Sequence, residues 1–224
     1  MKYIAALNEL EVPEAEESFF SGLQDRHDPR LVHWARSYHF FSMSQARLLG
    51  LVVGALPVTD YHSLTEVTKA LYEEFGSGDA SDVHSRLFAR FCEALGLPPA
   101  SLPVPRAEVE PGVLRYLDAI EAGYRSSEQA QMLATYCFLE RSAVLSYPLM
   151  LDCLESLGFA PEELTFFSTH VIQEAQHDLG AYMIAGRLIR STLEERSFER
   201  QLQAMQAAWT GFWQPFARQA VHAA

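Results

Sequence analysis

The chain has 224 residues, 49% of them hydrophobic, and a formal net charge of −12. The apolar share is enough for a sizeable core. The acidic balance argues against a non-specific nucleic-acid binder and against an anionic membrane surface as partner, because both need clustered lysine and arginine. No apolar run reaches the ~20 residues of a membrane-spanning helix.

Two further features predict a cytoplasmic protein. The first residues turn acidic at once and lack the pattern of a secretory leader. The three cysteines, Cys92, Cys137 and Cys153, fit no CxxC pattern and cannot all pair with one another. We therefore expect reduced thiols.

Helical periodicity dominates the chain, and strand alternation is scarce. Residues 1–13 form a tail or a short helix. Caps, glycines and prolines then delimit helices over residues 14–23, 29–56, 60–75, 82–95, 111–124, 126–157, 161–190 and 194–216. The pattern predicts an all-α protein, a single domain over residues 1–224 with about seven to nine helices.

Local signals fix several of these boundaries. Asp82 or Ser81 can cap the helix over residues 82–95. Asp28 followed by Pro29 is typical of an N-cap and a first helical residue. The helix that follows either continues past Ser44 or breaks before it. Pro148 predicts a stop or a kink, because proline lacks the N–H of a helical hydrogen bond. Residues 97–111 hold five of the eleven prolines and predict a loop.

One predicted helix carries three possible metal ligands. His170, Glu174 and His177 stand at i, i+4 and i+7, so at ~100° per residue they fall at roughly 0°, 40° and −20°. Two imidazoles with a carboxylate suit iron, manganese or zinc better than magnesium or calcium. Apolar neighbours argue against a merely solvated face, since a buried polar stripe must be paired or bound.

Two other segments offer further ligands. Glu74 ends a helix before the turn Gly76-Ser77-Gly78, and His84 opens the next helix; Glu73 in place of Glu74 remains open. Glu140 follows a run of apolar and aromatic residues, where a carboxylate is rarely buried alone. The alternative for His84 is an ordinary surface histidine, and the alternative for Glu140 is a salt bridge to an arginine.

Two families of metal sites do not match this pattern. A ferritin-like diiron site wants two Glu-x-x-His pairs, and the chain holds only Glu174 to His177. A zinc hydrolase of the usual kind wants His-Glu-x-x-His, which is absent.

The six candidate metal ligands follow one another along the chain in this order: Glu74, His84, Glu140, His170, Glu174 and His177. Over roughly residues 60–185 this order resembles the ligand set of the heme-oxygenase-like diiron oxidases, the superfamily of CADD-, UndA- and BesC-type proteins. Their fold is similar to that of TenA- and PqqC-type proteins. Two departures are Glu174, where the family commonly has aspartate, and Ala70, where asparagine is often seen.

The resemblance implies a heme-oxygenase-like helical bundle without heme. It implies that all six residues bind two iron ions, that Glu74, Glu140 and Glu174 are catalytic, and that O2 is the co-substrate. Asp178 and Gln173 are candidates to support the histidines.

The expected function is O2-dependent oxidation or oxygenation of a small carboxylate- or amine-bearing metabolite, with an amino-acid-like or fatty-acid-like substrate. Arg141 or Arg187 is a candidate for holding a substrate carboxylate. Four aromatic residues near the ligands suggest an apolar pocket, although most of them are expected in the core: Tyr136, Phe138, Phe166 and Phe167. We expect no nucleic-acid or membrane partner, and a homodimer is left open.

Two other functions compete with this one. A metal-free TenA-like hydrolase would use Cys137 as nucleophile with Glu140, which lies one helical turn later. A non-catalytic interaction protein would keep the polar stripe for structural reasons alone.

Overall fold

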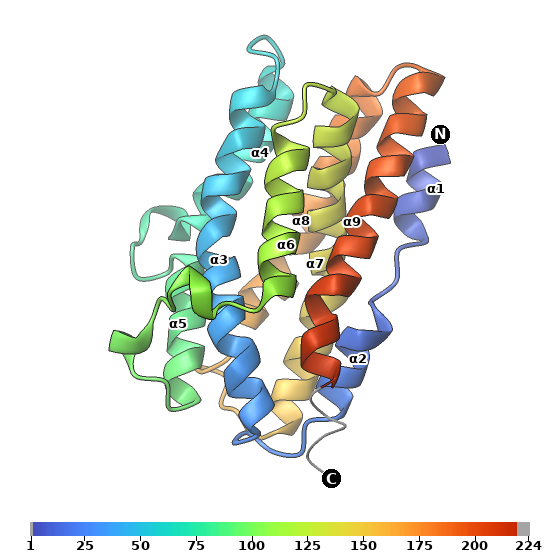
Figure 1. The fold of residues 1–224 in the computed structure, drawn as a ribbon. Helices are drawn as coiled ribbons and strands as arrows, with labels where there is room; N and C mark the ends of the chain where they lie inside the picture. Colours follow the sequence, from blue (N-terminus) through green and yellow to red (C-terminus); the bar gives the residue numbers. More distant parts are fainter. Residues whose placement is uncertain (1, 219–224) are drawn as a thin grey trace.

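A computed structural model describes residues 2–218, and its regular structure over that range is helical throughout (Figure 1). The α-helices are α1 Lys2–Asn8, α2 Glu14–Ser21, α3 Pro29–Ala55, α4 Tyr61–Glu74, α5 His84–Ala94, α6 Pro111–Tyr124, α7 Gln129–Ser156, α8 Thr165–Leu188 and α9 Thr192–Arg218. The all-α prediction is confirmed. The expected absence of a leader rests partly on Met1, which lies outside the described residues.

The long helices run side by side as a bundle (Figure 1). α7 packs against α8 and α9, while α3 packs against α4, α5 and α6. α6 also contacts α9, and α2 closes the bundle against α9 and α7. The interior is therefore enclosed by helices far apart in the sequence, and α7 and α8 lie next to each other for most of their length.

Aromatic rings fill one end of the interior. Trp34 of α3 and Trp213 of α9 are stacked, with ring centroids 6.1 Å apart and planes inclined by 22°. Phe19 and Phe20 of α2 contact both indoles, and all four side chains are buried. Burying rings of this size contributes about 1.5–3 kcal/mol each, so this cluster anchors the short helix α2.

The helix starts follow the local signals in part. The Asp28 carboxylate accepts from the Arg30 N–H, and Pro29 occupies the first turn, as predicted. α3 runs unbroken past Ser44, and α7 continues through Pro148. At Pro148, the packing of α7 against its neighbours outweighs the loss of one helical hydrogen bond.

Other boundaries differ from the prediction. Ser81 and Asp82 do not cap α5, whose N-cap is Val83 and has no side-chain cap. Ser81 instead donates to Asp79 through its backbone N–H and its hydroxyl, in a separate turn. The proline-rich stretch contains two short 3-10 turns, Pro99–Ser101 and Arg106–Glu108. Among the helices described, none is long and apolar enough to cross a lipid bilayer.

Candidate metal centre

All six predicted ligands come together inside the bundle, in two groups. The first triad is Glu74, His84 and His170, and the second triad is Glu140, Glu174 and His177. Within each triad, one ligand atom per residue lies within 4.8 Å of the others. The residues come from the end of α4, the start of α5, the middle of α7 and one face of α8.

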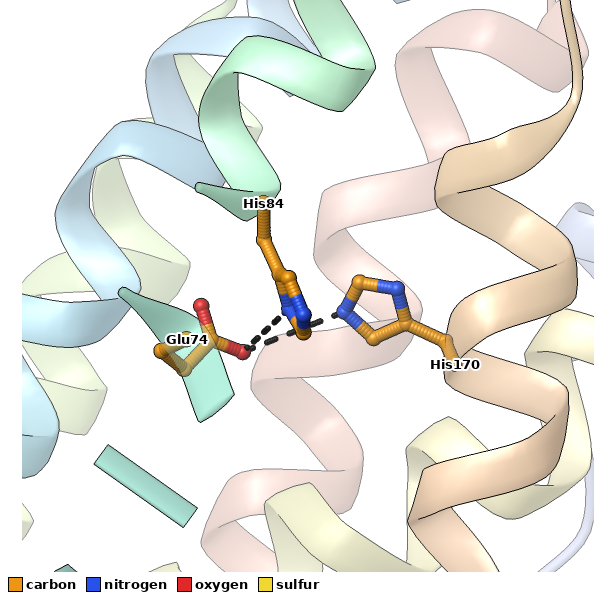
Figure 2. A group of neighbouring side chains, drawn as sticks. All are labelled: Glu74, His84 and His170. Atoms are coloured by element: carbon orange, nitrogen blue, oxygen red, sulfur yellow. Dashed lines mark hydrogen bonds and ion pairs between the residues drawn. The ribbon is translucent and has the colours of Figure 1, made fainter. Parts of the chain in front are cut away.

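The first triad depends on the turn between α4 and α5. Gly76 has φ of 76°, and a Cβ there would lie 2.7 Å from the backbone of Asp82 and Val83, so only glycine fits. The turn brings His84 back to Glu74: Nδ1 donates to Oε1 across 3.1 Å. His170 Nε2 lies 3.9 Å from the same oxygen (Figure 2).

The second triad is joined to the first by Glu174. His177 Nδ1 lies 3.7 Å from Glu140 Oε2 and 3.6 Å from Glu174 Oε2. The other oxygen of Glu174, Oε1, lies 3.9 Å from His170 Nε2. One carboxylate thus turns one oxygen toward each triad.

Burial governs the charge of these groups. It raises the pKa of Glu174 to about 8, although the contact with Glu140 lowers it in part. Burial, together with the negative charge of Glu174, raises the pKa of Glu140 well above its usual range. For Glu74 burial also acts to raise the pKa, but the hydrogen bond from His84 and the nearby imidazoles outweigh it, so its pKa is lowered. Burial and His84 lower the pKa of His170 to about 3.

Each triad histidine on α8 is oriented by a group outside the triads. His170 Nδ1 donates to the Phe166 carbonyl across 2.7 Å, which leaves Nε2 as the acceptor that faces the triads. His177 Nε2 donates to Glu73 Oε2 across 2.5 Å, which leaves Nδ1 toward the second triad. Glu74 is therefore the member of the first triad, and Glu73 contacts the outer nitrogen of His177, a distinction that the sequence left open.

The predicted supporting residues lie elsewhere. Asp178 pairs with Arg141 at 3.4 Å, and Gln173 Oε1 is buried without a hydrogen-bond partner. Asp178 follows His177 by one residue and so faces another side of α8. The contact of Glu73 with a histidine could have been expected from the sequence, because Glu73 lies next to Glu74 at the end of α4 and acidic groups commonly accept hydrogen bonds from metal-binding histidines.

The donor set fits a pair of transition-metal ions. Three carboxylates and three imidazoles converge in a buried space. The surrounding cavity has no lysine or arginine among its lining side chains to offset the carboxylates. Cations would restore Glu140 and Glu174 to their ionised forms, and mixed nitrogen and oxygen donors suit iron or manganese.

A cavity of about 100 Å³ opens beside the triads, mostly between α3, α7, α8 and α9. Tyr147 contacts the His170 ring, with centroids 4.2 Å apart, and its hydroxyl receives a hydrogen bond from Tyr38 at 3.1 Å. Among the aromatic residues that the sequence suggested for this pocket, Phe166 lines it. The others are buried in the core: Tyr136, Phe138 and Phe167.

The two arginines proposed for substrate binding are engaged elsewhere. Arg141 pairs with Asp178, and Arg187 pairs with Asp60. Neither lines the cavity. A substrate carboxylate in this cavity would have no arginine to pair with.

Cys137 is not placed as a nucleophile. Its side chain is fully buried, lies outside the cavity lining and donates to the Ala181 carbonyl across 3.4 Å. Burial, with the negative charges of Asp178 and Glu140, raises the pKa of this thiol well above its usual range. A reactive cysteine needs the thiolate, so the geometry does not support a TenA-like hydrolase that uses Cys137.

Comparison with solved structures shows a heme oxygenase-like fold. A CADD-like protein of unknown function from Nostoc punctiforme superposes with a TM-score of 0.77 at 20% identity, covering 98% of this chain and 96% of that one. A domain of unknown function with a heme oxygenase-like fold from Shewanella denitrificans gives 0.74 at 11% identity, covering 97% and 88%. A TenA family transcription regulator from Silicibacter gives 0.70 at 15% identity, covering 97% and 96%.

Sequence comparison is more specific about chemistry. A comparison with the curated proteins found no match. The profile of a family described as iron-containing redox enzymes matches residues 32–212, a span that includes both triads. The chain therefore belongs to this family of iron-containing redox enzymes.

Proposed function

We propose that the chain is a non-heme diiron enzyme that uses O2 to oxidise or oxygenate a small metabolite bearing an amine or a carboxylate. The observation that carries the proposal is Glu174, whose two carboxylate oxygens face different triads. A carboxylate in that position can bind two ions at once. Membership of an iron-containing redox family supports iron over zinc.

The residues of the chain have separable roles in this reaction. Glu74, His84 and His170 would hold one ion, and Glu140, Glu174 and His177 the other. Ferrous iron held by these residues would supply electrons for the activation of O2. Tyr147 and Phe166 pack against His170 and exclude water from the first triad. The adjoining cavity holds the substrate close to both triads.

Iron stoichiometry tests the proposal directly. Metal-free protein is titrated anaerobically with ferrous iron, and bound iron is counted per chain. We expect about two irons per chain in the wild type. We expect about one or fewer in His170→Ala and in His177→Ala, because each variant removes a donor from one triad. Oxygen uptake on admission of air then reports redox activity.

The matched control is His62→Ala, which removes an exposed histidine of α4. It should bind as much iron as the wild type. Negligible iron in the wild type, or an undiminished count in both triad variants, would contradict the diiron proposal.

The partners follow from the same argument. We infer a small-molecule substrate and no nucleic-acid or membrane partner, in keeping with the acidic charge. The three free cysteines favour a reducing compartment such as the cytoplasm. Assembly as a homodimer stays a prediction, which sedimentation equilibrium tests.

A further inference from the structure

A second buried polar cluster lies away from the triads. Glu16 of α2 is fully buried, and neither of its carboxyl oxygens has a hydrogen-bond partner. The Ser146 hydroxyl of α7 is also buried; it lies near Glu16 but makes no hydrogen bond with it or with another group. The indole N–H groups of Trp34 and Trp213 are also buried without a hydrogen-bond partner. Four unpartnered polar groups in an aromatic interior are unusual, because each is costly to bury.

Of the groups in this cluster, the Glu16 carboxyl costs the most free energy to bury. Among the described residues, no lysine, arginine or histidine pairs with it. Burial raises its pKa to about 8, and the Ser146 hydroxyl offsets that only in part. A buried carboxylic acid without a partner destabilises a fold and is typically kept for a function.

The cluster adjoins the cavity of the metal centre. Ser146 and Trp213 line that cavity, as does Glu140 of the second triad, whereas Glu16 is not a lining residue and lies beside Ser146. Ser146 follows Glu140 by six residues, a separation of about 9 Å along the axis of α7, and both residues line the cavity. A single small molecule in the cavity could therefore contact both the triads and the neighbours of Glu16.

The surroundings of Glu16 favour a cation over an anion. The cavity lining contains no lysine or arginine, so an incoming carboxylate would meet other acids and no permanently charged cation. Phe19 and Phe20 follow Glu16 on the same face of α2 and pack against Trp34 and Trp213. Aromatic faces attract an ammonium group, particularly where water is excluded.

We propose that Glu16 and Ser146 form a recognition subsite for the protonated amine of the substrate, whose other end lies at the metal triads. This rests on the proposed function and selects the amine-bearing class from it. On binding, the ammonium group donates to the Ser146 hydroxyl oxygen in the cavity wall. Glu16, beside Ser146, gives up its proton to solvent, and the Ser146 hydroxyl donates to the resulting carboxylate. The buried acid is then no longer without a partner.

The test measures binding to metal-free protein, so that it does not depend on iron or on turnover. Hexylamine, hexan-1-ol and hexanoate are titrated into the protein, and tryptophan fluorescence is recorded because Trp34 and Trp213 lie in the cluster. The wild type should bind hexylamine at least about tenfold more tightly than either of the other two, the effect of one well-placed ion pair.

Two variants decide the role of the carboxylate. Glu16→Gln keeps the shape of the side chain and should remove the preference for the amine. Glu17→Gln changes the neighbouring exposed acid of α2 and should leave it intact. An unchanged preference in Glu16→Gln, or tighter binding of hexanoate than of hexylamine by the wild type, would overturn the proposal.

Folding and iron binding are checked separately. Circular dichroism should show Glu16→Gln to be folded, because it replaces an unpaired acid by a neutral amide. Should it fail to fold, Ser146→Ala provides the decision: a several-fold loss of hexylamine affinity supports the subsite, and no loss contradicts it. Glu16→Gln should bind the wild-type amount of iron, so a failure of iron binding counts against the proposed function and not against the subsite.

Discussion

Buried and half-buried carboxylates in this chain differ in what they face, and that difference separates the roles proposed for them. Glu174 faces imidazoles of both triads, Glu73 accepts from the outer nitrogen of His177, and Glu16 lies near the Ser146 hydroxyl without a hydrogen bond or a cationic partner. The same side chain can thus serve as a candidate ligand, as a positioning group or as a recognition group. The geometry around each oxygen, rather than burial alone, separates these roles.

The distinction between Glu73 and Glu74 can be measured. Glu74→Gln should lower bound iron to about one per chain, because it removes a donor from the first triad. Glu73→Gln should keep the count but weaken iron affinity about 10- to 100-fold, since it loses only the acceptor that orients His177.

Anaerobic titration monitored by iron analysis gives both numbers. Glu155→Gln on the exposed side of α7 is the control and should match the wild type. Equal losses of stoichiometry in the two glutamate variants would show that Glu73 is itself a ligand.

Stability of the metal-free protein should depend on pH through Glu16. Its pKa in the folded chain is raised to about 8 from an ordinary value of 4.5. Between these two values the folded state holds a proton that the unfolded state has lost, so stability falls as pH rises from about 4.5 to 8.

Urea unfolding at several pH values measures this dependence. Glu16→Gln cannot titrate, so its free energy of unfolding should fall less over that range and exceed that of the wild type at pH 8. The gain there is of the order of 1–3 kcal/mol, the cost of an unsatisfied buried group. Parallel pH profiles for the two proteins would contradict this account.

The sequence revealed only some of these residues. His170, Glu174 and His177 were predictable because a helix of known pitch places them in one stripe. The sequence did not distinguish Glu16 from Glu14 and Glu17, because acidic residues so close together in a helix usually lie on its exposed face. Its position one turn before Phe19 and Phe20 was the available signal, but only the packing of α2 against α9 shows which acid turns inward.

At the scale of elements, the turn between α4 and α5 controls the first triad. Gly76→Ala should destabilise the protein by about 1–3 kcal/mol, because the new Cβ meets backbone atoms at 2.7 Å and the φ of 76° is unfavourable for alanine. Iron binding at the first triad should weaken as well, since the turn sets the approach of His84 to Glu74.

A matched glycine is available for comparison. A Cβ at Gly50 in α3 would meet no atom within 4 Å, so Gly50→Ala should be neutral or stabilise by up to about 1 kcal/mol. Thermal unfolding and iron titration of both variants provide the measurements. A Gly76→Ala protein as stable as Gly50→Ala would show that the turn adapts easily.

Element boundaries were less predictable than element types. Helical periodicity gave the long helices correctly, because their buried faces recur with the helical period. The cap of α5 was wrong: both Ser81 and Asp82 are good capping residues, but Asp79 binds Ser81 and so draws it away from the helix start. Such competition between short-range hydrogen bonds depends on loop geometry that the local sequence does not specify.

At the scale of the molecule, the candidate metal centre is built from four helices, some of which are far apart in the sequence. α4, α5, α7 and α8 each contribute at least one triad residue. In the metal-free state the convergence of three buried acids weakens the bundle, because burial and mutual repulsion raise the pKa of Glu140 and Glu174. Cations at the triads would turn that repulsion into attraction across the bundle.

Iron should therefore stabilise the folded protein strongly. A ligand that binds only the folded state at 100 times its dissociation constant adds about 2.7 kcal/mol. For a protein of this size, each kcal/mol corresponds to roughly 2–4 °C in Tm, so anaerobic ferrous iron should raise Tm by roughly 5–11 °C. Magnesium should have little effect, because it prefers oxygen donors alone and keeps its bound water.

The variants connect this global effect to the site. Replacing both His170 and His177 by alanine should remove most of the iron-dependent rise in Tm, whereas His62→Ala should retain it. Calorimetry with and without iron measures each rise. If the double variant gained as much stability from iron as the wild type, the ions would be binding elsewhere on this acidic chain, and the convergence of four helices on the triads would need an explanation other than metal.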